Sequence, residues 1–184
     1  WQVYIQNVLI NHTTAKGKVY KNLTSQAGIF ANTTGQIWAG TAGFSLLPNS
    51  QAEVVDEKGA KSKVQVNELT NLNYAFDHNG DCTLPGGIRI NGEKYIMVNF
   101  DPQAYLSKVG GKIKEADVKK APVLNVKKQG GGACILKVKT AYIIAVWEQA
   151  KKFTNPEGKQ ENQCAGRTTD AVIMLGNYLT LAGI

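Results

Sequence analysis

The chain has 184 residues, of which 43% are hydrophobic and 19% are charged, as expected for one globular domain spanning residues 1–184 with its own core. No apolar run approaches the roughly 18 residues of a membrane-spanning helix, and no secretory signal pattern opens the chain, so we expect neither membrane insertion nor secretion. The net charge of +7 favours acidic partners, although a solvated basic surface accounts for most individual lysines equally well.

Cysteine and histidine are too sparse and too scattered for a metal or redox site. The cysteines have no C-x-x-C spacing, and the chain holds only two histidines. We therefore expect free thiols in a reducing compartment, and neither a metal nor any other cofactor. The cysteines are Cys82, Cys134 and Cys164, and the histidines are His12 and His78.

The first ten residues have the pattern of an amphipathic helix. Their apolar positions recur at intervals of three and four, so they share one helical face. A polar segment rich in turn formers, residues 11–18, ends the helix. The apolar positions are Trp1, Tyr4, Ile5, Val8 and Leu9.

Two hairpins and a short helix are predicted next. Residues 26–30 and 36–39 read as strands around an Asn-Thr-Thr-Gly turn. Residues 53–56 and 63–66 read as an exposed hairpin, because the second run alternates apolar and polar side chains. Residues 67–76 form a helix that Asn67 can cap.

The middle of the chain is predicted to hold three more strands or hairpins. An Asn-Gly turn at residues 91–92 predicts a hairpin over 86–98. Residues 101–128 are lysine-rich and of mixed pattern, so we expect mostly loop there, with one short element. After a glycine run at 130–132, residues 133–139 and 141–147 read as strands.

The last part of the chain predicts a loop and then a helix. Residues 151–163 are polar and include Pro156 and Gly158, which favours a mobile surface loop. Residues 168–181 form a helix with Val172, Leu175 and Leu179 on one face. Thr168 or Thr169 suits its start, and Gly183 its end. Strands grouped between terminal helices indicate an α+β domain, with helices packed on an antiparallel sheet.

The sequence contains no recognised catalytic motif. There is no nucleophile elbow, phosphate-binding loop or HExxH pair. The glycine run at 130–132 reads as a turn or strand entry, Cys134 and Cys164 as ordinary thiols, and Asp56-Glu57 as a solvated turn. A binding module is therefore favoured over an enzyme, which would need a pocket with a strongly perturbed titratable group.

Several segments, in chain order, resemble the profilin family. They are Trp1-Gln2-x-Tyr4, Ile37-Trp38-Ala39, Gly92-Glu93-Lys94-Tyr95, Ile143-Ile144-Ala145 followed by Trp147, and Leu175-Gly176-Asn177-Tyr178-Leu179. The resemblance implies a non-enzymatic protein with a central antiparallel sheet and with N- and C-terminal helices packed together on one face. The 53–68 hairpin resembles the extra hairpin of apicomplexan profilins, which suggests a protist protein.

The resemblance implies a site for polyproline between the terminal helices. A polyproline helix is stiff before it binds, aromatic rings pack on its proline rings, and indole and tyrosine groups donate to its free carbonyls. The alternative is that these aromatics only join the helices to the sheet. The implied residues are Trp1, Tyr4, Trp38, Tyr178, Leu179 and Ile184.

The resemblance also implies an actin-binding face on the middle strands and the start of the last helix. Lysines there suit an acidic partner, although a solvated strand edge explains each of them almost as well. Asn99 stands where the family often has a basic residue, which weakens that contact. The implied residues are Lys94, Met97, Val98, Lys137, Lys139, Gly166, Thr169, Asp170 and Ile173, with Asp56 and Glu57 as additional contacts.

Two further classes of partner follow from the resemblance. We expect proline-rich proteins such as formins, and anionic phosphoinositides at the lysine-rich residues 108–128, where a merely soluble loop is the equal alternative. Nucleic acid is not expected. The protein would act in the cytoplasm on the cytoskeleton. The alternative function is an adaptor for proline-rich ligands or lipids with weak or absent actin binding.

Overall fold

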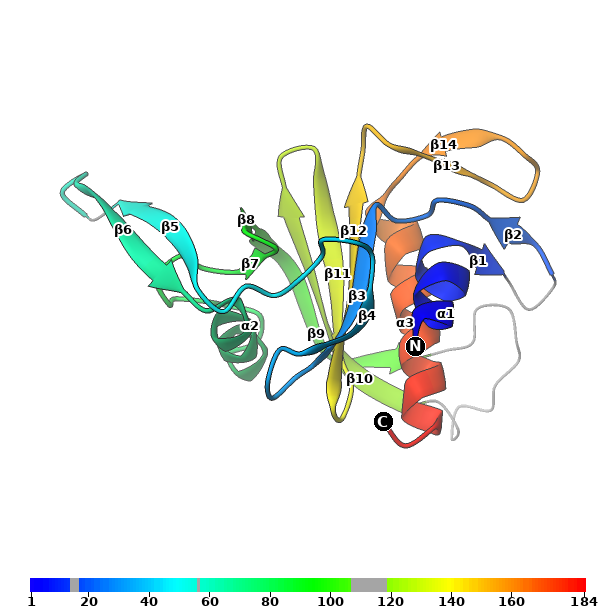
Figure 1. Cartoon of the computed structure of the whole chain (residues 1–184), viewed down its shortest axis with the longest axis horizontal. Coiled ribbons are helices and arrows are strands. Elements are labelled where there is room, and N and C mark those ends of the chain that lie inside the picture. The colour runs from blue at the N-terminus through cyan, green and yellow to red at the C-terminus, as the bar shows by residue number, and fades with distance from the viewer. Residues whose placement is uncertain (14–16, 56, 107–118) are drawn as a thin grey trace.

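The computed structural model describes residues 1–13, 17–55, 57–106 and 119–184. Figure 1 shows its elements. The helices are α1 (Gln2–Tyr4), the π-helical η1 (Ile5–Ile10), α2 (Glu68–Asp77) and α3 (Ala165–Leu181). The strands are β1 (His12–Thr13), β2 (Val19–Tyr20), β3 (Gln26–Ala31), β4 (Ile37–Gly40), β5 (Ser50–Val55), β6 (Lys61–Val66), β7 (Arg89–Ile90), β8 (Glu93–Lys94), β9 (Ile96–Leu106), β10 (Lys119–Lys128), β11 (Gly131–Lys137), β12 (Ala141–Glu148), β13 (Lys152–Thr154) and β14 (Gln160–Asn162).

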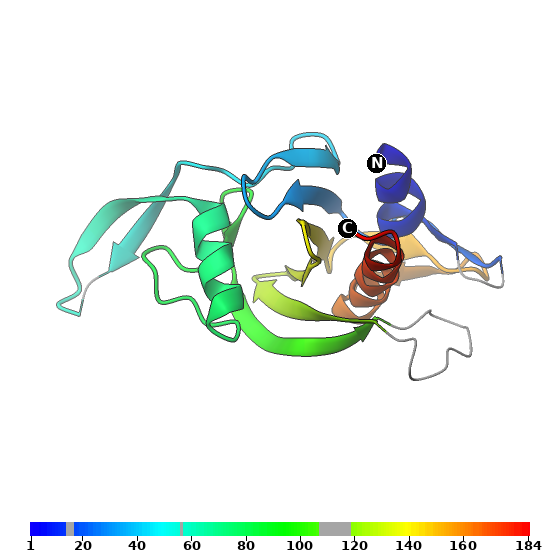
Figure 2. The same cartoon turned by 90° about the horizontal axis from the view of Figure 1, so that it is seen from below.

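A six-stranded antiparallel sheet forms the centre of the molecule. Its strand order is β4-β3-β12-β11-β10-β9, so β4 and β9 are the edge strands. The N-terminal helical segment and α3 lie together on one face, and α2 covers the other (Figure 2). The predicted α+β architecture is confirmed.

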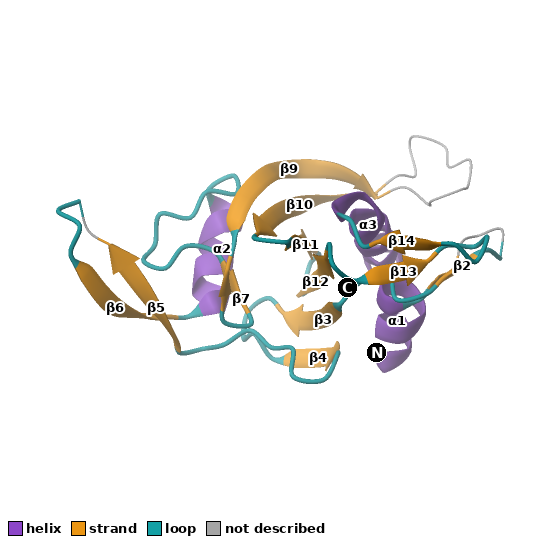
Figure 3. Ribbon diagram, turned by 90° about the horizontal axis from the view of Figure 1, so that it is seen from above, coloured by secondary structure: helices purple, strands orange, loops and turns teal. Residues whose placement is uncertain are grey.

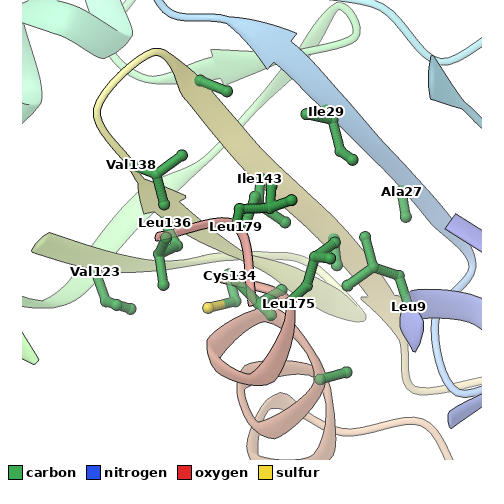
Figure 4. Packing of buried hydrophobic residues seen from close by; sticks show 14 of the residues in the cluster. Leu9, Ala27, Ile29, Val123, Cys134, Leu136, Val138, Ile143, Leu175 and Leu179 are labelled. Atoms are coloured by element: carbon green, nitrogen blue, oxygen red, sulfur yellow. The ribbon is translucent and has the colours of Figure 1, made fainter. Parts of the chain in front are cut away.

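The two faces of the sheet are buried by alternating side chains of the same strands. Leu136 and Ile143 point toward α3, where they pack with Leu175 and Leu179 (Figure 4). Their neighbours, such as Ile135, point toward α2. This follows from the two-residue period of a strand. Each such side chain, fully buried, contributes about 1.5–3 kcal/mol to folding.

The N-terminal helix is confirmed, but its second part is π-helical. The amide of Asn11 donates to the carbonyl of Gln6 at 2.8 Å, five residues back. Ile5 and Leu9 are fully buried against α3 and the sheet. Apolar spacing alone predicts a helical face, and it does not distinguish this wider turn from a regular one.

Both early hairpins and the capped helix are confirmed. β3 pairs with β4, and β5 pairs with β6 in a hairpin that projects away from the sheet in Figure 1. The side chain of Asn67 accepts a hydrogen bond from the Thr70 amide at 3.0 Å, which satisfies one free donor at the start of α2.

The prediction of mostly loop over residues 101–128 is wrong for the described part of that range. β9 and β10 pair from Lys119 opposite Leu106 to Lys127 opposite Ile96. The two prolines that argue against strands are accommodated, because Pro102 lies on the edge strand and Pro122 falls at a register shift. Accordingly, the predicted hairpin over 86–98 is short, consisting only of β7 and β8.

The predicted loop over residues 151–163 is also wrong, because it contains a third hairpin. β13 pairs with β14, and Pro156 and Gly158 belong to the turn between them. Phe153 is fully buried and anchors the hairpin to the core, while Thr154 forms a bridge with Lys21. The polar composition of the segment concealed this arrangement, since Phe153 is its one fully buried aromatic side chain.

The final helix begins three residues earlier than predicted. Cys164 precedes the helix without a side-chain cap, and Thr168 lies inside the first turn, where its hydroxyl donates to the Cys164 carbonyl. The predicted start at Thr168 or Thr169 is therefore wrong, whereas the end is confirmed, with Gly183 in the left-handed region at φ +83°. No helix in the described parts of the chain is long and apolar enough to cross a membrane.

Candidate functional site

Four aromatic side chains form a continuous row, which we call the aromatic strip: Trp38, Trp1, Tyr4 and Tyr178. The ring centroids of Trp38 and Trp1 are 5.2 Å apart, those of Trp1 and Tyr4 are 6.0 Å apart, and those of Tyr4 and Tyr178 are 5.2 Å apart. The rings come from β4, the N-terminal segment and α3, so the fold assembles the strip from distant parts of the sequence.

The strip is open to solvent while its base is buried. The side chains of Trp1 and Tyr178 are 45% and 55% exposed, and Tyr4 and Trp38 are half-buried. A hydrogen bond with the Tyr178 hydroxyl raises the pKa of Tyr4, so the Tyr4 hydroxyl remains protonated at neutral pH. Flat aromatic faces beside hydroxyl and indole donors suit a ligand with apolar rings and unpaired carbonyls.

Leu179 and Ile184, the other two predicted members of this site, differ in burial. Leu179 is only 1% exposed and belongs to the core cluster on the α3 face of the sheet, so it supports the helix that carries Tyr178. Ile184 is half-buried and packs against the same core. The sequence pattern places Leu179 beside Tyr178 in the chain, but adjacent residues of a helix face different directions.

A second surface lies where the start of α3 meets the sheet. A hollow of about 340 Å³, which we call the α3 hollow, opens there. Its lining residues are Val98, Asn99, Asn125, Val126, Lys127, Ala133, Trp147, Ala165, Gly166, Thr169 and Asp170.

The α3 hollow brings together four of the residues predicted to bind actin: Val98, Gly166, Thr169 and Asp170. The Thr169 hydroxyl hydrogen-bonds to the Asn125 side chain at 3.1 Å, which ties α3 to β10. Asp170 lies 3.7 Å from Arg167 in the same helix. Ile173, one turn later, is half-buried against the core.

The other predicted actin contacts are not gathered at this hollow. Lys137 lies on the opposite sheet face, 3.6 Å from Asp77 of α2, and Lys139 is exposed in the turn after β11. Lys94 and Met97 line a separate hollow of 660 Å³ beside the β5–β6 hairpin. Glu57 is exposed near the tip of that hairpin, and Asp56 lies outside the described residues.

Trp147 is a large residue of this surface that the sequence analysis did not predict to bind a partner. It ends β12, is half-buried and lines the α3 hollow. Gly132 makes room for it, since a Cβ at that position would lie 2.9 Å from the indole nitrogen of Trp147. A bulky aromatic paired with a glycine on the neighbouring strand was the available signal.

Cys134 and Cys164 lie in different surroundings. Cys134 is buried, and burial raises its pKa to about 12, so its thiol stays protonated at neutral pH. Cys164 is exposed. Among the described residues, no group of three or more His, Cys, Asp or Glu side chains is arranged to hold a metal.

Comparison with known proteins identifies the family. The sequence model of the profilin family matches residues 1–184. A profilin of Tetrahymena pyriformis is 30% identical over 184 residues, which is 100% of this chain and 97% of the relative. Acanthamoeba castellanii profilin IB and Schizosaccharomyces pombe profilin share the fold, with TM-scores of 0.54 and 0.55 and identities of 21% and 19%, over 100% of this chain and 99% of each structure. This chain therefore belongs to the profilin family, whose members are non-enzymatic actin-binding proteins.

Proposed function

We propose that this protein binds actin monomers at the α3 hollow and the adjacent edge strand, and proline-rich segments at the aromatic strip, as one cytoplasmic domain without enzymatic activity that regulates actin polymerisation. Family membership supports the actin part of the proposal. The observation that carries the proposed site is the convergence of Val98, Trp147, Gly166 and Asp170 on one hollow.

The edge strand beside the α3 hollow supports a protein partner of large area. Ile96, Met97 and Val98 follow one another on β9 and are 63%, 39% and 56% exposed. Three consecutive exposed apolar side chains on an unpaired strand edge are unfavourable in water, so a surface of this kind usually serves an interface. Lys127 at the rim suits an acidic partner.

Calorimetric titration of purified monomeric actin, at low and moderate salt, tests the actin part. We expect saturable one-to-one binding. Trp147→Ala should weaken it roughly tenfold or more, because a large aromatic in the centre of an interface often carries most of the binding energy. The Trp38→Ala variant serves as control and should bind actin normally. If the folded protein shows no binding at either salt, the actin proposal is wrong.

The aromatic strip supports binding of a polyproline helix. Such a ligand loses little entropy on binding because it is already extended, and the strip offers rings and donors in a row. We expect Trp38→Ala to abolish binding of a decaproline peptide without loss of the fold. Tryptophan fluorescence titration and thermal unfolding measure the two effects. Tyr74→Ala, an aromatic change on α2 across the sheet, is the matched control. Full retention of affinity in Trp38→Ala would contradict the assignment.

Two further parts of the proposal concern partners. Proline-rich proteins such as formins are the expected ligands of the strip. For phosphoinositides, the described lysines of the predicted region are Lys119, Lys120, Lys127 and Lys128, while the others lie outside the described residues. Lys120 lies over the Tyr105 ring and Lys128 lies 4.0 Å from Glu93, so these two are partly engaged within the protein. Flotation with vesicles that contain phosphoinositide tests this part.

The adaptor alternative is favoured by one observation. Lys137 and Lys139, two of the predicted actin contacts, lie away from the α3 hollow, and Lys137 is already paired with Asp77. If decaproline binds and actin does not, a proline-ligand adaptor is the correct function. The two titrations above therefore separate the alternatives.

A further inference from the structure

A polar hollow of 400 Å³ lies beside the N-terminal helix, and we call it the lysine hollow. Gln6 and Ile10 of η1 form one wall, and Thr41, just after β4, forms another. Lys151 and Lys152, at the start of the β13 hairpin, close it. Nothing in the proposed actin or polyproline sites uses this hollow.

The lysine hollow adjoins one end of the aromatic strip. The side chain of Gln2 donates a hydrogen bond to the Gly40 carbonyl at 3.2 Å, next to the Trp1–Trp38 pair. Gln6 lies four residues further along the same helical row as Gln2, so it continues the seam between the helix and β4. Figure 3 shows the N-terminal helix running from the end of β4 toward β13. A ligand that leaves the strip along this seam therefore enters the lysine hollow.

The electrostatics of the lysine hollow favour an anion. Two lysines line it, and its described lining residues include no carboxylate. Lys152 hydrogen-bonds to Asn162, and Lys151 pairs with Glu148 at 3.2 Å. That pair is half-exposed, and exposed pairs of this kind are weak, so Lys151 is free to exchange Glu148 for a ligand carboxylate.

The floor of the lysine hollow is rigid. Gln163 is 2% exposed, and its amide donates to the Asn22 carbonyl at 2.8 Å and accepts from the Glu148 amide at 3.0 Å. The Thr24 hydroxyl is buried and bonded to the Leu9 carbonyl at 3.0 Å. Because these groups are satisfied internally, the two lysines are the groups in the hollow best able to respond to a charged ligand.

We propose that the lysine hollow binds an acidic residue that flanks the proline-rich segment on the aromatic strip. The inference rests on the proposed polyproline function and names the class of ligand: a proline-rich segment with a carboxylate beside it. From Gln2 to Ile10 the segment would rise roughly 12 Å as a regular α-helix, and it rises somewhat less because Ile5–Ile10 is π-helical. A polyproline helix advances about 3.1 Å per residue, so the carboxylate stands about three to five residues beyond the proline packed on Trp1 and Trp38.

Four peptides test the proposal: ten prolines followed by two glutamates, ten prolines preceded by two glutamates, and the two glutamine counterparts. Fluorescence titration at low and high salt measures their affinities. We expect the glutamate peptide of one polarity to bind roughly three- to tenfold more tightly than its glutamine counterpart at low salt, with the gain disappearing at high salt.

Two double variants complete the experiment. Lys151→Gln with Lys152→Gln should remove the gain and leave the affinity for plain decaproline unchanged. Lys63→Gln with Lys159→Gln removes the same charge from exposed sites outside the hollow and should keep the gain. Equal affinities of the glutamate and glutamine peptides, a gain that survives the first variant, or a gain lost in the control would overturn the inference. Failure of plain decaproline to bind would instead refute the polyproline function, and this inference with it.

Discussion

His12 is a buried histidine with an unsatisfied ring nitrogen. It is 4% exposed, and its Nδ1 has no hydrogen-bond partner. It lies against Tyr20 of β2, with Arg167 and Asp170 of α3 as the charged groups nearby. Burial lowers its pKa, and the charge of Arg167 acts in the same direction, while the Val8 carbonyl and Asp170 oppose the shift. The folded protein therefore holds this ring in its neutral form.

The lowered pKa of His12 predicts a loss of stability in mild acid. The unfolded chain takes up a proton near pH 6.5 and the folded protein only at lower pH, so the contribution is complete above pH 6.5 and falls as the pH drops below it. The slope is at most about 1.4 kcal/mol per pH unit. Urea unfolding between pH 8 and pH 5 measures it. His12→Phe should show a shallower fall over this range, and an identical pH profile in both proteins would exclude His12 as the cause.

At the scale of the elements, two glycines decide how closely β11 packs between its neighbours. A Cβ on Gly131 would lie 2.4 Å from the Trp147 carbonyl oxygen, and one on Gly132 would lie 2.4 Å from the Val126 carbonyl oxygen. Both clashes are with backbone atoms of paired strands, which cannot move independently of the sheet. The glycine run read from the sequence as a strand entry is therefore a packing requirement of the strand itself.

Gly132→Ala should destabilise the protein by about 1–3 kcal/mol, the range for overpacking a filled interior. Chemical unfolding measures the change. Gly166→Ala is the control, because a Cβ there meets no atom within 4 Å and alanine favours a helix over glycine by about 1 kcal/mol. It should leave stability unchanged or raise it. If Gly132→Ala were as stable as the unsubstituted protein, the contact with Val126 would not limit packing.

The elements that the sequence predicted well have either a regular spacing of apolar side chains or a continuous apolar run. Val172, Leu175 and Leu179 mark α3, and the apolar run of β12 marks a buried strand. β9 and β10 were missed because Pro102, Pro122 and flanking lysines imitate a loop, and only the pairing of the strands accommodates them. A local pattern does not report such pairing.

The candidate sites were predictable to different degrees. The four rings of the aromatic strip come from motifs near Trp1, Trp38 and Tyr178, and the structure places them in contact. The α3 hollow was predicted only in part, since the face to which a lysine points depends on its place in the two-residue alternation of its strand. Lys137 lies on the face opposite Thr169 for that reason.

At the scale of the whole molecule, the β5–β6 hairpin has its buried side chains at its base. Ala52 and Val66 are buried there, while Val55 near the tip is 60% exposed. Glu53 pairs with Lys63 across the two strands, and the strand pairs nearer the tip contribute little to the core. We therefore expect the outer part of the hairpin to contribute little to the stability of the fold.

Replacing residues 54–62 by Asn-Gly should shorten the hairpin without harming the fold. Glu53 and Lys63 then flank a two-residue turn, which suits an antiparallel pair. We expect the free energy of unfolding to change by less than about 1 kcal/mol, since exposed surface carries little stability. Decaproline affinity should not change, whereas actin affinity should fall if Glu57 contacts actin. A large loss of thermal stability would show instead that the tip supports the core.

The aromatic strip joins the N-terminal helix to α3, and this has a thermodynamic consequence. A ligand that spans the strip binds only while Ile5 and Leu9 remain docked, because undocking the helix removes Trp1 and Tyr4 from the row. Ligand at one hundred times its dissociation constant would therefore oppose undocking by about 2.7 kcal/mol. Amide hydrogen exchange in residues 5–10 would slow about a hundredfold, so occupancy of the surface could be read from the backbone beneath it.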